Sequence, residues 1–171
     1  MKKVHPLAGG SARERMNLFH EQSLDVVEEV IRVNLFGALN CIHAAAKHMI
    51  AGGGGKIISI GSIVATQGRV RCVEYSAAKG AIIAATKSLA KELGPQNINV
   101  NCVSPGIVER GTLADPGEFA TQHSCLNRMC TPDDIASMVF FLTLPETSYV
   151  TGQNYIVDGG RSLALMGDGR M

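Results

Sequence analysis

Residues 56–62 form the run Lys-Ile-Ile-Ser-Ile-Gly-Ser, which is typical of a strand buried on both faces of a parallel sheet. Four glycines at residues 52–55 stand directly before it. Such a cluster ends a preceding helix, and because a strand follows it, the cluster lacks the helix N-terminus that a phosphate-binding loop requires. We therefore interpret residues 52–55 as a connecting loop and residues 56–60 as a buried strand.

A long helix is predicted before this strand. Ser23 offers a capping hydroxyl, and the helix runs over residues 23–50. Its apolar residues recur at the spacing of one helix face: Val26, Val27, Val30, Ile31, Leu35 and Leu39. Residues 1–22 show no clear periodicity, and we expect them to be irregular.

Strands and helices alternate after residue 60. A second helix is predicted from near Tyr75 to Gly94, followed by strands at residues 98–103 and 154–157. Helices of roughly ten residues or more between successive strands indicate βαβ units. These units predict an α/β fold, in which helices cover both faces of a parallel sheet.

A third helix is predicted from Thr131 to about Leu142. Thr131 is a capping residue, Pro132 stands at the first helical position, and two aspartates follow at the positive end of the helix dipole. The stretch from the Ser104-Pro105-Gly106 turn to Cys130 is expected to be irregular and to form a mobile loop region. Residues 163–171 are expected to form a frayed tail.

The composition argues against several classes of protein. With 171 residues, 46% of them hydrophobic and 18% charged, the chain is expected to form one domain over residues 1–171. A net charge of +1 without a run of like charges argues against nucleic-acid binding. No apolar stretch approaches the ~20 residues that cross a bilayer, and no apolar signal core follows the N-terminal lysines. We expect a soluble cytoplasmic protein without nucleic-acid or membrane partners.

Cysteine and histidine show no metal-binding pattern. The five cysteines, an odd number without a Cys-x-x-Cys pair, are Cys41, Cys72, Cys102, Cys125 and Cys130. They suit a reducing cytoplasm, and we interpret them as small core residues. His43 and His48 lie five positions apart on a predicted helix, so they do not share a face as metal ligands would. We expect no metal site.

Tyr75 and Lys79 are the first candidates for catalysis. They lie four positions apart at the start of a predicted helix, so their side chains share one face. A nearby ammonium favours phenolate and lowers the pKa of a phenol from its reference value of ~10, which suits acid–base chemistry. On an exposed helix the same pair is usually only a solvated face. Ser62 supports the catalytic interpretation, because it ends a parallel strand where open α/β sheets bind their ligands.

Seven short segments extend this pattern over most of the chain. They are residues 33–35 (Val-Asn-Leu), 58–62 (Ile-Ser-Ile-Gly-Ser), 75–79 (Tyr-Ser-Ala-Ala-Lys), 99–101 (Asn-Val-Asn), 104–106 (Ser-Pro-Gly), 151–153 (Thr-Gly-Gln) and 158–160 (Asp-Gly-Gly). In these segments the sequence resembles the short-chain dehydrogenase/reductase family, of the type that includes bacterial 3-oxoacyl carrier-protein reductases. The resemblance covers roughly residues 23–162, in the family's order and with almost no gaps.

The resemblance implies an oxidoreductase that uses a nicotinamide cofactor on a small-molecule carbonyl or alcohol. Tyr75 would exchange a proton with the substrate oxygen, and Ser62 would hydrogen-bond to that oxygen. Lys79 would lower the pKa of Tyr75 and bind the nicotinamide ribose. Asn34 would hold a water that links Lys79 to solvent. An asparagine inside a helix costs up to ~0.7 kcal/mol relative to alanine, which hints at a specific role there.

The cofactor implied by the resemblance is NAD or NADP. Its binding residues would be Tyr75, Lys79, Pro105, Gly106, Ile107 and Thr112. The family places a threonine just after the Pro-Gly turn. The match without a gap is Arg110, whereas Thr112 takes the role if the loop carries two extra residues. The strand whose end reads the ribose 2′ position is not recognisable, so the choice between NAD and NADP stays open.

The family's N-terminal cofactor-binding half has no counterpart in the sequence. No Thr-Gly-x-x-x-Gly-x-Gly turn occurs. Residues 4–9 are similar to the Asn-Asn-Ala-Gly end of a family strand, but both asparagines are replaced. We therefore expect an α/β fold with a partial Rossmann-type doubly wound parallel sheet that lacks its N-terminal cofactor-binding strands. The strand at residues 56–60 would then have an unpaired edge.

Two functions remain open on this basis. The first is an NAD(P)-dependent oxidoreductase, and apolar residues within 109–130 suggest an acyl, alkyl or ring carbonyl substrate. The second is a catalytically silent remnant or interaction subunit that cannot hold a dinucleotide. The resemblance implies a homodimer or homotetramer through helices 23–50 and 75–93, whose small residues permit close packing. A module for another nucleotide lacks any supporting phosphate loop.

Overall fold

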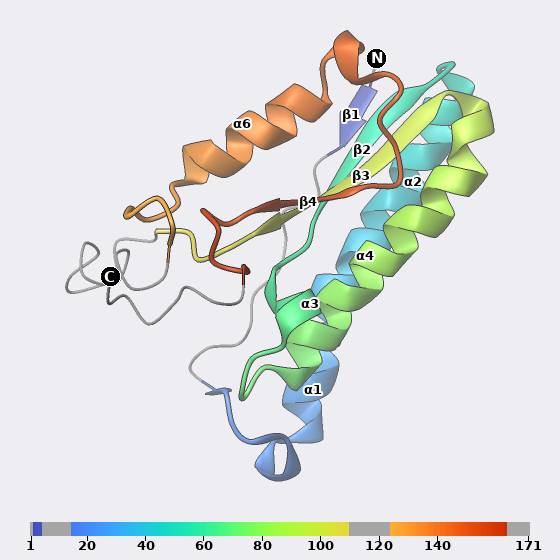
Figure 1. Ribbon diagram of the computed structural model, residues 1–171. Helices are drawn as coiled ribbons and strands as arrows, with labels where there is room; N and C mark the ends of the chain where they lie inside the picture. The colour runs from blue at the N-terminus through green and yellow to red at the C-terminus, as the bar shows by residue number, and fades with distance from the viewer. Residues whose placement is uncertain (1, 5–14, 110–123, 164–171) are drawn as a thin grey trace.

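The computed structural model describes residues 2–4, 15–109 and 124–163, and within them four strands form one parallel sheet (Figure 1). The strands neighbour one another in sequence order: β1 (Lys2–Val4), β2 (Gly55–Ile60), β3 (Ile98–Pro105) and β4 (Asn154–Val157). The longest pairing joins β2 to β3, from Gly55 opposite Ile98 to Ile60 opposite Val103. The predictions of an α/β fold, of a parallel sheet and of strands at β2, β3 and β4 are confirmed.

β1 corrects two expectations, that residues 1–22 are irregular and that β2 has an unpaired edge. β1 pairs in parallel with the first half of β2, and Lys2 lies opposite Gly55 while Val4 lies opposite Ile57. Residues 2–4 read Lys-Lys-Val and lack the apolar alternation that reveals a half-buried strand. Because β1 is joined to the sheet through backbone groups, its sequence carries no signal of the pairing.

The helices agree with the predicted ones to within a few residues. The longer helical segments are α1 (Leu24–Ile31), η3 (Arg32–Phe36), α2 (Gly37–Ala51), α4 (Val73–Leu93) and α6 (Pro132–Leu142). The shorter ones are η2 (Phe19–Glu21), α3 (Val64–Gln67), η4 (Gly94–Gln96) and η5 (Pro145–Thr147). α1, η3 and α2 follow one another without a break and correspond to the helix predicted over 23–50. Ser23 caps it as predicted, because its side chain accepts from Asp25 N at 3.3 Å.

Helices cover both faces of the sheet, as predicted. α2 and α4 lie side by side on one face, and α6 lies on the other (Figure 1). Alternate residues of each strand point to opposite faces and so separate the two layers. Ile57 and Val100 pack with α2 and α4, whereas Ile58 and Val103 pack with α6. β2 and β3 are therefore buried between two apolar layers.

The start of β2 is anchored by a buried lysine. Lys56 is 1% exposed, and its Nζ donates to Leu144 O and to Thr147 Oγ1, both at 2.6 Å. Thr147 belongs to η5, just after α6. A buried ammonium is stable only when its donors are satisfied, so these contacts tie β2 to the segment that follows α6.

Some expectations fall outside the described residues. They concern Arg110, Thr112, residues 5–9, residues 110–123 of the loop at 109–130 and residues 164–171 of the tail. Among the described helices, none is both long and apolar enough to cross a membrane.

Candidate active site

Three of the four predicted catalytic residues lie just after β2 and in the first two turns of α4. Ser62 comes two residues after β2, and Tyr75 and Lys79 occupy the first two turns of α4. Parallel pairing brings the end of β3 to the same edge of the sheet, where Ile63 N donates to Pro105 O at 3.2 Å. The predicted nicotinamide turn therefore lies beside the segment that carries Ser62.

Lys79 links Tyr75 to the end of β2. Its Nζ lies 5.8 Å from the centroid of the Tyr75 ring and donates to Ile60 O at 2.9 Å. Lys79 is buried, and this burial lowers the pKa of its ammonium below the usual value, while the nearby sulfur of Cys102 opposes the shift. The shared face of Tyr75 and Lys79 agrees with the sequence analysis. The Ile60 carbonyl and the Cys102 sulfur were not identified there, because both lie on other strands.

Ser62 is held in a defined orientation by a local backbone contact. Its side chain is buried, and its Oγ accepts from Val64 N at 3.2 Å, at the start of α3. This bond occupies an oxygen lone pair and leaves the hydroxyl hydrogen able to donate to a carbonyl oxygen. Such a short local turn fixes a serine without the help of distant residues.

Asn34, the fourth predicted catalytic residue, lies in the π-helix η3. It is fully buried, and its Nδ2 donates to Val30 O at 2.9 Å, one turn earlier. A π-turn interrupts the regular ladder of backbone hydrogen bonds, and such turns occur often at functional sites. The sequence analysis predicted a regular helix here. The only sequence signal was the asparagine itself, which is unfavourable inside a regular helix.

The turn at residues 105–107 is closely packed against the segment after β4. Gly106 N donates to Val157 O at 3.0 Å. A Cβ added at Gly106 would lie 2.8 Å from Asp158 Cβ and 2.9 Å from its Cα, so glycine is required for this approach. The close contact fixes where β3 ends and so places Ile107 at the edge of the sheet.

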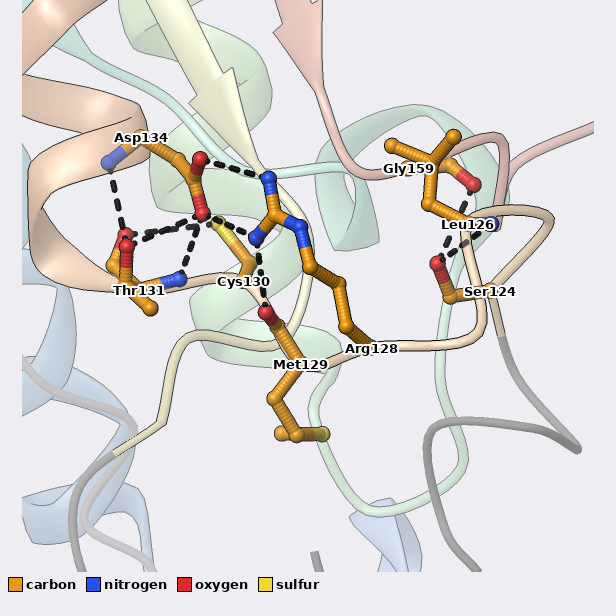
Figure 2. A network of polar contacts seen from close by, with 8 residues as sticks. All are labelled: Ser124, Leu126, Arg128, Met129, Cys130, Thr131, Asp134 and Gly159. Carbon is orange, nitrogen blue, oxygen red and sulfur yellow. Dashed lines mark hydrogen bonds and ion pairs between the residues drawn. The ribbon is translucent and has the colours of Figure 1, made fainter. Parts of the chain in front are cut away.

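A polar network precedes and caps α6 (Figure 2). Arg128 binds the Asp134 carboxylate with its two terminal guanidinium nitrogens, at 2.6 and 2.8 Å. The Asp134 carboxylate also accepts from Thr131 N at 2.8 Å, which closes the predicted cap of α6 as a capping box. The bonds from Arg128, and then those from Thr131, hold the pKa of Asp134 well below its usual range. The network fixes the start of α6.

A cavity of about 220 Å³ lies against this network. Apolar side chains of Ile107, Leu126, Met129 and Val157 form part of its wall, together with the charged side chains of Arg128, Asp134, Asp158 and Arg161. Ile107 is shared with the predicted nicotinamide turn, so the cavity borders the candidate site. The sequence analysis interpreted the apolar residues within 109–130 as part of a substrate site, and two of them, Leu126 and Met129, lie in the wall of this cavity.

Comparison with known proteins gives the family. A family model described as Enoyl-(Acyl carrier protein) reductase matches residues 4–162. The chain belongs to the short-chain dehydrogenase/reductase family. The match covers β2, β3, β4 and all the longer helices, including every described residue of the candidate site.

Characterised members of this family are similar over nearly the whole chain. A 3-oxoacyl-[acyl-carrier-protein] reductase of Chlamydia pneumoniae is 39% identical over 162 residues, which are 92% of this chain and 65% of that protein. A 3-alpha-(or 20-beta)-hydroxysteroid dehydrogenase of Mycobacterium tuberculosis is 35% identical over 95% of this chain and 62% of its own length. The chain therefore spans somewhat less than two thirds of these relatives.

Solved structures of the family agree with the fold. The acetoin dehydrogenase of Salmonella typhimurium superimposes with a TM-score of 0.88 at 32% identity, over 98% of this chain and 67% of that chain. A 4-hydroxyisoleucine dehydrogenase complexed with NADH gives a TM-score of 0.86 at 28% identity, over 95% of this chain and 70% of that chain. The arrangement of sheet and helices described above is thus the arrangement found in short-chain dehydrogenases.

Proposed function

We propose that this chain is an NAD(P)-dependent oxidoreductase that interconverts a carbonyl compound and its alcohol. One observation carries the proposal: the buried Lys79 ammonium lies 5.8 Å from the Tyr75 ring centroid and is held on Ile60 O at 2.9 Å. A cation fixed beside a phenol favours the phenolate and makes the phenol a better acid near neutral pH. Ser62, at the same edge of the sheet, supplies the hydroxyl that such a reaction needs at the substrate oxygen.

Each residue has a defined task in this reaction. In the direction of reduction, Tyr75 donates its phenolic proton to the carbonyl oxygen, while the Ser62 hydroxyl donates a hydrogen bond to that oxygen and polarises the bond. Lys79 stabilises the phenolate that remains. Asn34 lies in the π-turn η3, and by family resemblance it holds a water that returns a proton to this pair.

The described residues at this edge of the sheet fit the nicotinamide end of NAD or NADP, and the dinucleotide supplies the hydride when it is bound. An ammonium has three N–H donors, and Ile60 O takes one donor of Lys79, so the other two suit the hydroxyls of a ribose. Pro105, Gly106 and Ile107 would lie against the nicotinamide, since they end β3 at the same edge of the sheet. The titration described below distinguishes between NAD and NADP.

The substrate class we propose is an acyl, alkyl or ring compound with a carbonyl or hydroxyl group. Two relatives support this range, because one reduces a 3-oxoacyl chain and the other is a hydroxysteroid dehydrogenase, as their names state. The cavity beside Ile107, with Leu126, Met129 and Val157 in its wall, supports an apolar portion of such a molecule.

A second candidate function is an interaction subunit that pairs with another copy of the chain. It is favoured by large apolar side chains that remain exposed along η3, α2 and α4: Val33, Phe36, Ile50 and Val73. Large apolar side chains exposed on helices are typical of surfaces that contact other proteins. A homodimer or homotetramer through these helices is compatible with the oxidoreductase and with the interaction subunit. A catalytically silent subunit, in contrast, excludes the oxidoreductase function.

Titration of the purified chain with NADH and with NADPH tests the proposal. Nicotinamide fluorescence and thermal stability report binding, and Tyr75→Phe, Lys79→Ala and the exposed control Lys87→Ala are compared with the wild type. We expect saturable binding that Lys79→Ala weakens and Lys87→Ala does not. With a panel of ketones, Tyr75→Phe should abolish turnover without abolishing cofactor binding. A folded chain that binds neither dinucleotide at millimolar concentration would contradict the proposal and support the interaction subunit.

A further inference from the structure

The end of β2 is packed without spare volume at Gly61. This glycine lies between Ile60, whose carbonyl accepts the Lys79 ammonium, and Ser62. A Cβ added at Gly61 would lie 2.9 Å from Cys102 Sγ and closer still to Ser104 Oγ. Carbon atoms do not approach neighbours so closely in a well-packed interior. Position 61 therefore has room for glycine only, as long as Cys102 and Ser104 keep their places.

Both neighbours are held where they are. Cys102 and Ser104 lie on β3 and are fully buried. Ser104 Oγ donates to Asn154 Oδ1 on β4 at 2.7 Å, so its hydroxyl cannot turn away without losing a buried hydrogen bond. On the other side, Gly61 N donates to Val103 O at 2.8 Å, which holds the backbone of Gly61 against β3.

Cys102 also lies beside Lys79. Burial raises the pKa of its thiol to about 11, so the thiol is neutral at physiological pH. Among the described residues, the titratable groups beside the Lys79 ammonium are therefore Tyr75 on α4 and the neutral thiol of Cys102 on β3. The ammonium is held by a carbonyl and lies near an aromatic ring, and no ion pair with a carboxylate of the described residues is present.

We propose that Ser104 and Cys102 are positioning residues for Lys79. They fill the space beside Gly61, fix the end of β2, and so set the place of the Ile60 carbonyl that holds the ammonium near Tyr75. Neither residue touches a reacting atom. The importance of this placement for catalysis rests on the proposed function. The packing of Gly61 against Cys102 and Ser104 does not depend on that function.

The test measures directly how the Lys79 ammonium affects the ionisation of Tyr75, and it needs neither cofactor nor substrate. The chain has three tyrosines, so a background with Tyr149→Phe and Tyr155→Phe leaves Tyr75 as the single phenol, and its ionisation is followed by phenolate absorbance as a function of pH. Gly61→Ala should raise the ionisation midpoint by about one pH unit, because the displaced ammonium no longer stabilises the phenolate. Gly80→Ala is the matched control. Its Cβ would meet only Ala65 O, at an ordinary 3.8 Å, so the midpoint should stay unchanged.

A rescue variant separates positioning from general damage. Gly61→Ala combined with Ser104→Ala and Cys102→Ala makes room for the new methyl group and should bring the midpoint back toward the background value. If Gly61→Ala alone does not fold, the triple variant should fold and melt cooperatively.

Two results would overturn the inference. One is a folded Gly61→Ala chain whose midpoint equals that of the background. The other is a triple variant that behaves no better than Gly61→Ala. A chain that shows the expected pattern but binds no dinucleotide would keep the positioning inference and refute the proposed function, so the two failures are distinguishable.

Discussion

Replacing Thr147 with valine removes an oxygen acceptor from the buried ammonium of Lys56. Lys56 Nζ donates to Thr147 Oγ1 and to Leu144 O, both at 2.6 Å, and both side chains are almost fully buried. Valine has nearly the shape of threonine, so the packing stays intact. The bond from Lys56 is lost together with the bonds of the hydroxyl to Leu142 O at 3.1 Å and Leu144 O at 2.8 Å. The change therefore measures what these polar contacts contribute to fixing the start of β2.

The size of the effect follows from the charge on the donor. A hydrogen bond to a charged group contributes about 1.5–3 kcal/mol, and the ammonium left behind keeps its full desolvation cost. Thr147→Val should lower the free energy of unfolding by about that amount. For a chain of this length each kcal/mol corresponds to about 2–4 °C, so the melting temperature should fall by about 3–12 °C.

Urea unfolding, followed by far-ultraviolet circular dichroism, measures the difference. Thr86→Val is the matched control, because Thr86 is equally buried but donates to a neutral carbonyl, Ile82 O, at 2.9 Å. Its loss should be only about 0.5–1.5 kcal/mol. If Thr147→Val costs no more than Thr86→Val, the idea that the lysine contact anchors β2 is refuted.

Three further predictions concern the candidate site and its surroundings. Asn34→Ala leaves the Val30 carbonyl without its side-chain donor, and the free energy of unfolding in urea should fall by about 1–3 kcal/mol, whereas the exposed control Asn40→Ala should have little effect. Cys102 has a thiol pKa raised from 9.0 to about 11, so the native state binds more protons than the unfolded state between these values and stability falls as pH rises. Across this window the free energy of unfolding of Cys102→Val should fall by up to about 2.7 kcal/mol less than that of the wild type. If both free energies fall equally as pH rises, the assigned burial of the Cys102 thiol is contradicted. Asp134 has a depressed pKa, so its stabilisation is present above 3.8 and is lost as pH falls below that value. The stability gap between wild type and Asp134→Asn, measured by acid unfolding, should therefore narrow below pH 3.8.

The sequence by itself determined the alternation of strands and helices and the spacing of the candidate catalytic residues. These features are local. The β-branched run at β2, the cap at Thr131 and the apolar spacing along 23–50 each depend on neighbouring positions, so each was visible without the fold. Tyr75 and Lys79 share a face because of helix geometry alone. Ser62 could be placed near them because strands of a parallel sheet end at one edge.

Only the tertiary structure decided the contacts between distant segments. β1 exists because an edge of β2 accepts it, although residues 2–4 carry no strand pattern. A π-turn stands at Asn34 where a regular helix was predicted, and the acceptors of the Lys56 ammonium lie 88 and 91 positions further along the chain. Gly61 has to be glycine because of two side chains on β3. Close packing and buried hydrogen bonds couple residues that are remote along the chain, and no period or motif in the sequence records such couplings.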